Sequence, residues 1–280
     1  MKFTKMHGIG NDYIYFNCME NDIDDPNSLS EKLSDRHFGV GGDGIVMILP
    51  SEKCDFRMRM FNADGSEGKM CGNASRCIGK YVYERGLTDK TVITLETLGG
   101  VKTLSLDVKD GKVLSVSVDM GKAEFDADKV PVKWDKKQVV GEEFTVDGKT
   151  WTITCVSVGN PHCVIFTDED ISKMRLDEIG PKFENNPAFP ERINTEFVNV
   201  IDRNRLNMRV WERGSGETLA CGTGASAVVS AAVKNGICDP DTFVTVGLIG
   251  GELSIMYKSD GSVLMKGPAE FVFEGEMCND

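Results

Sequence analysis

The chain lacks an excess of positive charge. Its 280 residues include 32 lysines and arginines against 44 aspartates and glutamates, so the formal net charge at pH 7 is −12. Because nucleic-acid-binding domains usually carry a surplus of basic side chains, this composition argues against a nucleic-acid partner.

Long apolar runs are also missing. No stretch of the sequence approaches the roughly 20 apolar residues that a membrane-spanning helix needs. The N-terminal segment MKFTKMHGIGNDY has no apolar core of the kind that a secretory signal peptide carries. We therefore expect a cytoplasmic protein that has no membrane partner.

The nine cysteines form no C-x-x-C pair, and the three histidines form no H-x-x-x-H pair. This absence excludes the common zinc motifs and a thioredoxin-type redox centre. Without a secretory signal, the odd number of cysteines favours reduced thiols over a disulfide framework. The glycine-rich stretches match no nucleotide motif, since GVGGDG (39–44) precedes a predicted strand and no Walker lysine follows a glycine loop. The sequence therefore predicts neither a metal site nor a nucleotide cofactor.

What the chain does contain is a long internal repeat. An offset of 150 residues aligns FRMRMFNADGSEGKMCGNASRCIGKYVYERG with LNMRVWERGSGETLACGTGASAVVSAAVKNG, and it pairs Cys71 with Cys221. Each copy reads as a strand with alternating apolar residues, a glycine-rich loop and a helix. A period of this length indicates a duplicated domain.

The duplication predicts an α+β fold with two pseudo-symmetric domains, each a mostly antiparallel sheet wrapped around one central helix. Hairpin turns are predicted at three Asp-Gly pairs, 110–111, 147–148 and 260–261. We place the N-terminal repeat over residues 1–125 with Cys71, and the C-terminal repeat over residues 126–280 with Cys221. The last strand of the second repeat can pack back on the first domain. Two related halves are expected to enclose a cleft, which is the usual place for a site.

Both repeated cysteines stand at the start of a predicted helix. The first amides of a helix are unpaired and carry the positive end of its dipole, so a thiol there is expected to have a lowered pKa and to act as a base. The same amides, at Gly72 and Asn73 and at Gly222 and Thr223, are expected to bind a carboxylate. Packing is the commoner role of a single cysteine, but two cysteines at matching repeat positions favour a function.

Two thiols that face one carbon from opposite sides suit a reaction that inverts a stereocentre. One thiolate removes a proton α to a carboxylate, and the other thiol returns a proton to the opposite face. Two helix N-termini can stabilise the negative charge that develops meanwhile. A Cys–His nucleophile stays open as an alternative, because the stretch GNPHC supplies His162.

Polar residues follow several of the predicted strands. Four asparagines end apolar strands, namely Asn11, Asn62, Asn160 and Asn194. An acidic and a basic residue, Glu212 and Arg213, precede the second cysteine loop. Turn formation alone would account for any single asparagine at such a position, and Glu212 and Arg213 could be an ordinary solvated ion pair. Together these groups suit a zwitterionic amino acid, since Arg213 can bind a carboxylate bidentately and Glu212 can accept from an ammonium group.

These motifs resemble those of the diaminopimelate epimerase family. The similarity runs from MHGIGNDY through FNADGSEGKMCGNASRC and GNPHCVIF to ERGSGETLACGTGAS, in the same order along nearly the whole chain. The resemblance implies a cofactor-independent isomerase that interconverts LL- and meso-diaminopimelate in lysine and peptidoglycan precursor biosynthesis. It also implies two domains that close on the substrate, often in a homodimer.

The resemblance further implies roles for individual residues. Cys71 and Cys221 would be the acid–base pair, and His162 and Glu212 would poise them. The substrate would be bound by Asn11, Asn62, Gly72, Asn73, Asn160, Asn194, Glu212, Arg213, Gly222 and Thr223. The chain departs from some family members at Gly44, where they have a substrate-contacting glutamine, so that contact is lost or replaced.

Three other functions stay open at this point. The first is a related two-cysteine epimerase or racemase that acts on proline, hydroxyproline or histidine. The asparagines and the pair Glu212 and Arg213 favour instead a substrate with a second charged end. A phenazine-biosynthesis-like isomerase would share the fold but not the cysteine pair. A non-catalytic amino-acid-binding or thiol redox-sensing protein would use the same cleft without proton transfer.

Overall fold

The structure is a computed structural model that describes residues 1–20 and 22–278. Contacts between Cα atoms divide it into two compact units. Unit 1 consists of Met1–Asp119 and Lys266–Asp280, and unit 2 consists of Met120–Met265. The chain therefore leaves unit 1 within strand β8 (Lys112–Lys122) and returns to it within strand β17 (Ser262–Gly267).

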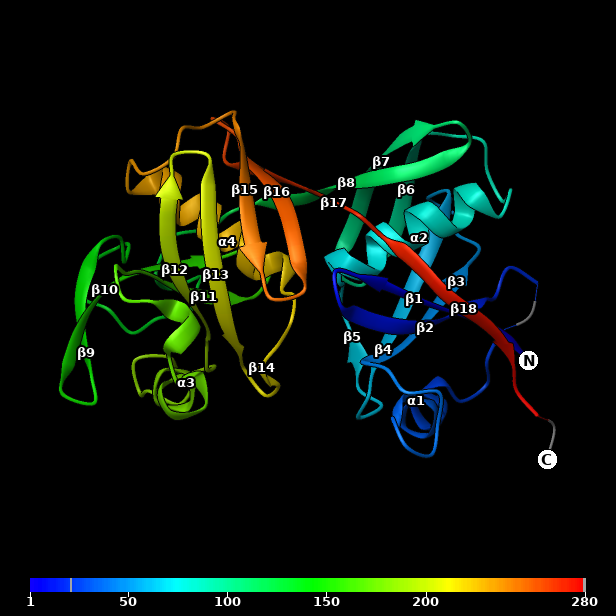
Figure 1. The fold of residues 1–280 in the computed structure, drawn as a ribbon, viewed down its shortest axis with the longest axis horizontal. Helices are drawn as coiled ribbons and strands as arrows, with labels where there is room; N and C mark the ends of the chain where they lie inside the picture. The colour runs from blue at the N-terminus through cyan, green and yellow to red at the C-terminus, as the bar shows by residue number, and fades with distance from the viewer. Residues whose placement is uncertain (21, 279–280) are drawn as a thin grey trace. The chain divides into compact units, whose positions relative to one another are not determined.

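Unit 1 is built on one sheet and two helices. Hydrogen bonds order its strands as β18, β1, β2, β3, β4, β6, β7 and β8, and the short β5 pairs with the end of β4. Its further elements are β1 (Lys2–Gly8), β2 (Asn11–Asn17), α1 (Pro26–Ser34), β3 (Gly44–Leu49), β4 (Phe56–Asn62), β5 (Glu67–Gly68), α2 (Gly72–Glu84), β6 (Val92–Thr97), β7 (Gly100–Lys109) and β18 (Glu270–Glu276). Figure 1 shows β18, in red, lying along β1, in blue, so segments far apart in the sequence share this sheet.

Unit 2 is built in the same way. Its strands pair in the order β9, β10, β11, β12, β13, β15 and β16, and the short β14 pairs with the end of β13. Its further elements are β9 (Glu142–Val146), β10 (Lys149–Ser157), β11 (Pro161–Phe166), the 3₁₀ helix η1 (Ile171–Lys173), α3 (Leu176–Glu184), β12 (Asn194–Asp202), β13 (Arg205–Glu212), β14 (Gly216–Glu217), α4 (Gly222–Lys234), β15 (Phe243–Leu248) and β16 (Gly251–Tyr257).

The two units share one pairing pattern. In unit 1 the pairs β2–β3 and β4–β6 are parallel, and in unit 2 the corresponding pairs β11–β12 and β13–β15 are parallel. The other strand pairs named above are antiparallel. The predicted α+β fold class, with mostly antiparallel sheets and few helices, is confirmed.

The sheet of unit 2 carries different side chains on its two faces. Because side chains alternate along a strand, the register of β11 and β12 places His162, Asn194 and Glu196 on one face. Helix α4 packs on this face, against β10, β11 and β12. The face under α4 therefore holds His162 and Asn194, which the sequence analysis singled out, together with Glu196.

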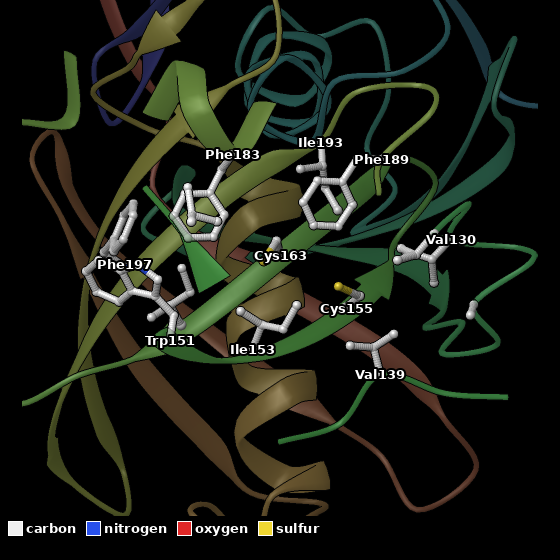
Figure 2. Close-up of a cluster of buried hydrophobic side chains, with 14 of the residues drawn as sticks. Val130, Val139, Trp151, Ile153, Cys155, Cys163, Phe183, Phe189, Ile193 and Phe197 are labelled. Carbon is white, nitrogen blue, oxygen red and sulfur yellow. The ribbon is translucent and has the colours of Figure 1, made fainter. Parts of the chain in front are cut away.

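The opposite face of the same sheet carries an apolar core. Figure 2 shows Phe183 of α3 beside Phe197 of β12, and their ring centroids lie 5.8 Å apart in an edge-to-face arrangement. Cys155 and Cys163 sit opposite each other on β10 and β11 in this cluster. Both thiols are buried among apolar side chains, so they contribute to the packing of this core.

Helices α2 and α4 end in the same manner. Each is followed by a glycine with a left-handed backbone, Gly86 with φ +70° and Gly236 with φ +72°, which only glycine adopts without strain. The paired glycines of the repeat are therefore helix stop signals. Among residues 1–20 and 22–278, no helix combines the length and the apolar character that crossing a membrane requires.

Candidate active site

Cys71 is the N-cap residue of α2. Its backbone is extended, with φ −134° and ψ 121°, and its Sγ accepts a hydrogen bond from the amide of Ala74 at 3.4 Å. An N-cap side chain normally satisfies one of the unpaired amides in the first turn, and here a sulfur does so. The thiol is half-buried. The prediction that Cys71 lies at a helix start is confirmed.

Asn11 connects Cys71 to its neighbours in unit 1. Its Oδ1 accepts hydrogen bonds from the Cys71 thiol at 3.4 Å and from Nδ2 of Asn73 at 3.1 Å. Its Nδ2 donates to Oδ2 of Asp43 at 2.7 Å, which fixes the orientation of the amide. Burial raises the pKa of Asp43, and the charge of Asp12 adds to the rise. The sequence analysis did not predict Asp43. Its place in the stretch GDG, after a glycine run, was the signal that could have identified it.

Asn62 and Gly44 face each other at the ends of β4 and β3. Nδ2 of Asn62 donates to Oγ of Ser66 at 3.0 Å, so this side chain shapes its own turn. Gly44 has φ +151°, and a Cβ built on it would lie 1.9 Å from the carbonyl oxygen of Phe61. The two strands approach so closely that a side chain at position 44 fits only if the backbone of β3 or β4 shifts.

Cys221 is the N-cap residue of α4, in the same local geometry as Cys71. Its backbone has φ −121° and ψ 105°, and its Sγ accepts a hydrogen bond from the amide of Gly224 at 3.3 Å. The hydroxyl of Thr223 lies 3.5 Å from the sulfur. The side chain is buried, with 4% of its surface exposed. The predicted placement at a helix start is confirmed for this cysteine as well.

The acidity predicted for Cys221 is wrong in direction. Burial raises the pKa of this thiol well above its ordinary value, and the negative charges of Glu212 and Glu196 add to the rise. The hydrogen bonds from Thr223 and Gly224 lower the pKa, as expected of a helix N-terminus, but they do not outweigh burial and two carboxylates. The sequence showed the helix start but not the burial.

His162 is held between two side chains under α4. Its Nδ1 is 2.6 Å from Oε1 of Glu196, and its Nε2 is 2.9 Å from Oδ1 of Asn160. The side chains of His162 and Glu196 are fully buried. Burial raises the pKa of Glu196, while His162 lowers it. Glu196 was missed by the sequence analysis, because a glutamate within a strand is most often exposed.

Three further predicted residues lie at or next to the ends of β12 and β13. Asn194 begins β12 beside His162, and its Oδ1 accepts from the backbone amide of Arg213 at 2.9 Å. The guanidinium of Arg213 donates to the carbonyl of Glu191 at 2.9 Å. Glu212 ends β13 and accepts from the hydroxyl of Thr218. Nδ2 of Asn194 is buried and has no hydrogen-bond partner in the described part of the chain, so it offers a donor to a ligand.

The structure groups the predicted residues by unit. In unit 1, Asn11, Cys71 and Asn73 form one hydrogen-bonded network, whereas Asn62 bonds within its own turn. The corresponding group of unit 2 comprises Asn160, His162, Asn194, Glu212, Arg213, Cys221 and Thr223. Gly72 and Gly222 are the first residues of α2 and α4. Within residues 1–20 and 22–278, no three His, Cys, Asp or Glu side chains gather as a metal site would require.

Sequence comparison finds close relatives of the whole chain. The family model described as diaminopimelate epimerase matches residues 3–125 and 154–272. A protein of Acetivibrio thermocellus named diaminopimelate epimerase is 55% identical over 99% of this chain and 98% of its own length. One of Methanococcus maripaludis with the same name is 52% identical over 99% of both chains.

Solved structures with the same fold are much more distant in sequence. A hydroxyproline epimerase from Agrobacterium vitis superposes with a TM-score of 0.71 at 13% identity, covering 98% of this chain and 91% of that one. A phenazine biosynthesis protein of Bacillus anthracis gives a TM-score of 0.69 at 17% identity, covering 100% and 99%. Both establish the fold alone. The family match over both halves and the identity to full-length relatives establish more: the chain belongs to the diaminopimelate epimerase family.

Proposed function

We propose that this chain is an amino-acid epimerase that interconverts LL- and meso-2,6-diaminopimelate, a step of lysine and peptidoglycan precursor biosynthesis. The observation that carries the proposal is the 55% identity, over 99% of the chain, to a relative named for this activity. The position of Cys71 and Cys221 as N-caps of matching helices supports it.

In the proposed reaction the two sulfurs act on opposite faces of one α-carbon. One cysteine, as the thiolate, takes the α-proton and becomes a thiol, and the electron pair of the broken C–H bond moves onto the substrate carboxylate as an enediolate. The other thiol delivers its proton to the opposite face of the carbon and becomes a thiolate. The stereocentre is then inverted and the two sulfurs have exchanged protonation states, so the pair can run the reaction in either direction.

The remaining predicted residues have binding and charge-stabilising roles in this proposal. The amides that open α2 and α4, at Gly72, Asn73, Gly222 and Thr223, hold the reacting carboxylate and stabilise the enediolate. The side chains proposed to bind the rest of the substrate are Asn11, Asn62, Asn160, Asn194, Glu212 and Arg213. Arg213 suits a carboxylate and Glu212 suits an ammonium group. His162 and Glu212 are proposed to poise the cysteines.

The proposed chemistry uses side chains and main-chain amides, so added pyridoxal phosphate or metal is not expected to change the rate. We also propose that the enzyme works as a cytoplasmic homodimer. Val272 and Phe273 on β18 are 53% and 46% exposed and offer an apolar surface to a second copy. Sedimentation equilibrium should give twice the 30.7 kDa chain mass, and cell fractionation should place the protein in the cytosol. A monomer that keeps full activity would remove the dimer from the proposal.

Exchange with solvent deuterium tests the proposed function directly. Purified, reduced protein incubated with LL-diaminopimelate in D₂O is expected to introduce deuterium at the α-carbon and to produce the meso isomer, as measured by NMR and chiral chromatography. Parallel incubations with proline, hydroxyproline and histidine test the other racemase substrates. If the protein turns over one of these amino acids and not diaminopimelate, that amino acid becomes the proposed substrate. If no deuterium exchange occurs with diaminopimelate or with any of the three, the proposal of an epimerase is contradicted.

A further inference from the structure

Glu196 is a buried carboxylate that the proposed reaction does not use. Its Oε1 is 2.6 Å from Nδ1 of His162, and its Oε2 has no hydrogen-bond partner among the described residues. None of its side chain is exposed. Burying a carboxylate is costly unless its oxygens are satisfied, and replacing a buried charged pair by apolar side chains is often neutral or stabilising. A stabilising role therefore does not explain why a carboxylate stands here.

The first unit shows that the fold does not need a carboxylate at this place in the sheet. The repeat offset matches Glu196 with Val46, which is also fully buried. The strand registers agree, since Val46 pairs with Met60 and Glu196 pairs with Val210, two residues that the same offset relates. Unit 1 has a buried valine at the place in its sheet where unit 2 has the glutamate under α4. The difference between the two units points to a function that belongs to unit 2.

The carboxylate lies beside Cys221. A Cβ built on Gly224 would be 2.9 Å from Oε1 of Glu196 and 3.2 Å from Sγ of Cys221. The first turn of α4 is therefore in contact with both groups, and the glycine leaves room for them. The matching position in α2 is Ala74, which is fully buried, and the residue that matches Glu196 is the buried Val46. Glycine at position 224 and glutamate at position 196 thus form one local arrangement.

We infer that Glu196 is a positioning residue for the half of the reaction that Cys221 performs. Its carboxylate holds the ring of His162 in one orientation, with a proton on Nδ1, and keeps a negative charge beside Cys221 that favours the thiol over the thiolate. The titratable side chains near Cys221 on the α4-facing side of β11, β12 and β13 are His162, Glu196 and Glu212. The inference rests on the proposed function, because it assigns Cys221 a proton transfer.

The chemical consequence concerns the strength of the Cys221 thiolate as a base. A sulfur that holds its proton tightly is a strong base once it has lost that proton. The α-proton of an amino acid is very weakly acidic, so a stronger base brings the two partners closer in proton affinity. Glu196 raises the basicity of the Cys221 thiolate by its charge. The hydrogen bond between Glu196 and His162 fixes the imidazole ring beside the carboxylate, and with it the contact of His162 to Asn160.

Glu196→Gln tests this role, because glutamine keeps the shape and removes the charge. The pH midpoint for alkylation of Cys221 by iodoacetamide, followed by peptide mass spectrometry on the unliganded protein, should fall by about one pH unit. The midpoint of Cys71 in the same samples should not change. The turnover number should fall about tenfold, which matches one pKa unit of lost basicity in the Cys221 thiolate, with KM unchanged. Glu196→Asp should keep the wild-type midpoint of Cys221, because it keeps the charge.

Thr195→Val is the matched control. Thr195 is equally buried and adjacent on β12, and its side chain lies on the opposite face of the sheet. This variant should match wild type in both midpoints and in turnover. Equal shifts at both cysteines, no shift at Cys221, or full turnover by Glu196→Gln would each overturn the inference. The alkylation measurement needs no substrate, whereas failure of the wild type to turn over diaminopimelate would contradict the proposed function alone.

Discussion

The two repeated cysteines share their backbone setting and differ in their surroundings. Cys71 is half-buried and donates to the neutral amide of Asn11. Cys221 is almost fully buried, and the charges of Glu196 and Glu212 disfavour its thiolate. The duplicated fold thus places both sulfurs as N-caps of matching helices, while the side chains around the two sulfurs differ. In the proposed reaction the two groups perform opposite steps in any one direction, so they do not need the same surroundings.

The largest expected effect comes from removing either sulfur. Cys71→Ala and Cys221→Ala should each lower the rate of inversion by at least about a thousandfold, because each deletes one of the two proton-transfer groups. The rate is measured by conversion of LL-diaminopimelate followed by chiral chromatography.

Cys77→Ala is the control for these two variants. Cys77 is a buried residue of α2 whose position in the second repeat is taken by Ala227, so alanine suits the helix. This variant should keep most of the activity. Near-normal inversion by either of the other two variants would contradict the assignment of two proton-transfer groups.

Gly44 marks a second difference between the units, because the matching residue in unit 2 is Asn194. Gly44→Gln should lower the free energy of unfolding by about 3 kcal/mol, since its Cβ would meet the carbonyl oxygen of Phe61. Urea denaturation measures the loss.

Gly86→Ala separates backbone strain from this clash. Gly86 has φ +70° and nothing within 4 Å of a built Cβ, so alanine there should cost about 1 kcal/mol. A loss at Gly44→Gln no greater than at Gly86→Ala would show that β3 can move away from β4.

The pair Gly224 and Glu196 can be converted to the residues of unit 1. Gly224→Ala alone should lower the free energy of unfolding by about 1 kcal/mol, because the added methyl group meets Glu196 and Cys221. The double variant with Glu196→Val reproduces the combination of Ala74 and Val46 and should recover that loss. Urea denaturation of the single and double variants gives the coupling. Strictly additive effects would mean that the two positions do not act together.

The smallest expected effect is the pH dependence of stability that Glu196 confers. Its pKa in the folded protein is raised by burial, so the fold favours the protonated carboxyl. This contribution is complete below the ordinary carboxyl pKa and is lost as the pH rises through the raised value. Glu196→Gln should therefore lack this pH dependence, so its stability relative to wild type should rise as the pH rises through the raised carboxyl pKa. The free energy of unfolding of both proteins is measured by urea denaturation across this pH range. Parallel curves of this free energy against pH would contradict the prediction.

The fold class and the places of the two cysteines could be predicted because their signals are local. Strand alternation and the glycine that ends each helix can be recognised within short stretches, and the repeat offset follows from aligning two such stretches. The same offset pairs Cys71 with Cys221 but Cys77 with Ala227, so only Cys71 is one of the repeated cysteines. The helix starts themselves followed from the loops KMCGNAS and LACGTGA.

The features that sequence reasoning missed depend on packing between distant segments. Glu196 stands in NTEFVNV, where alternation alone leaves open which face is covered, and α4 decides that from another part of the chain. The raised pKa of Cys221 has the same origin, because burial arises only when the helix packs on the sheet. The role of Asp43 can be recognised only from the structure, where Asn11 donates a hydrogen bond to it.

The pairing of β18 with β1 has a consequence for how the chain is made. The polypeptide leaves unit 1 near Asp119 and returns near Lys266, so unit 2 is inserted into unit 1. During synthesis, all of unit 2 has left the ribosome before the strand that completes the first sheet. The N-terminal unit is therefore the last to be finished, the reverse of the usual order in which domains complete their folding as they emerge.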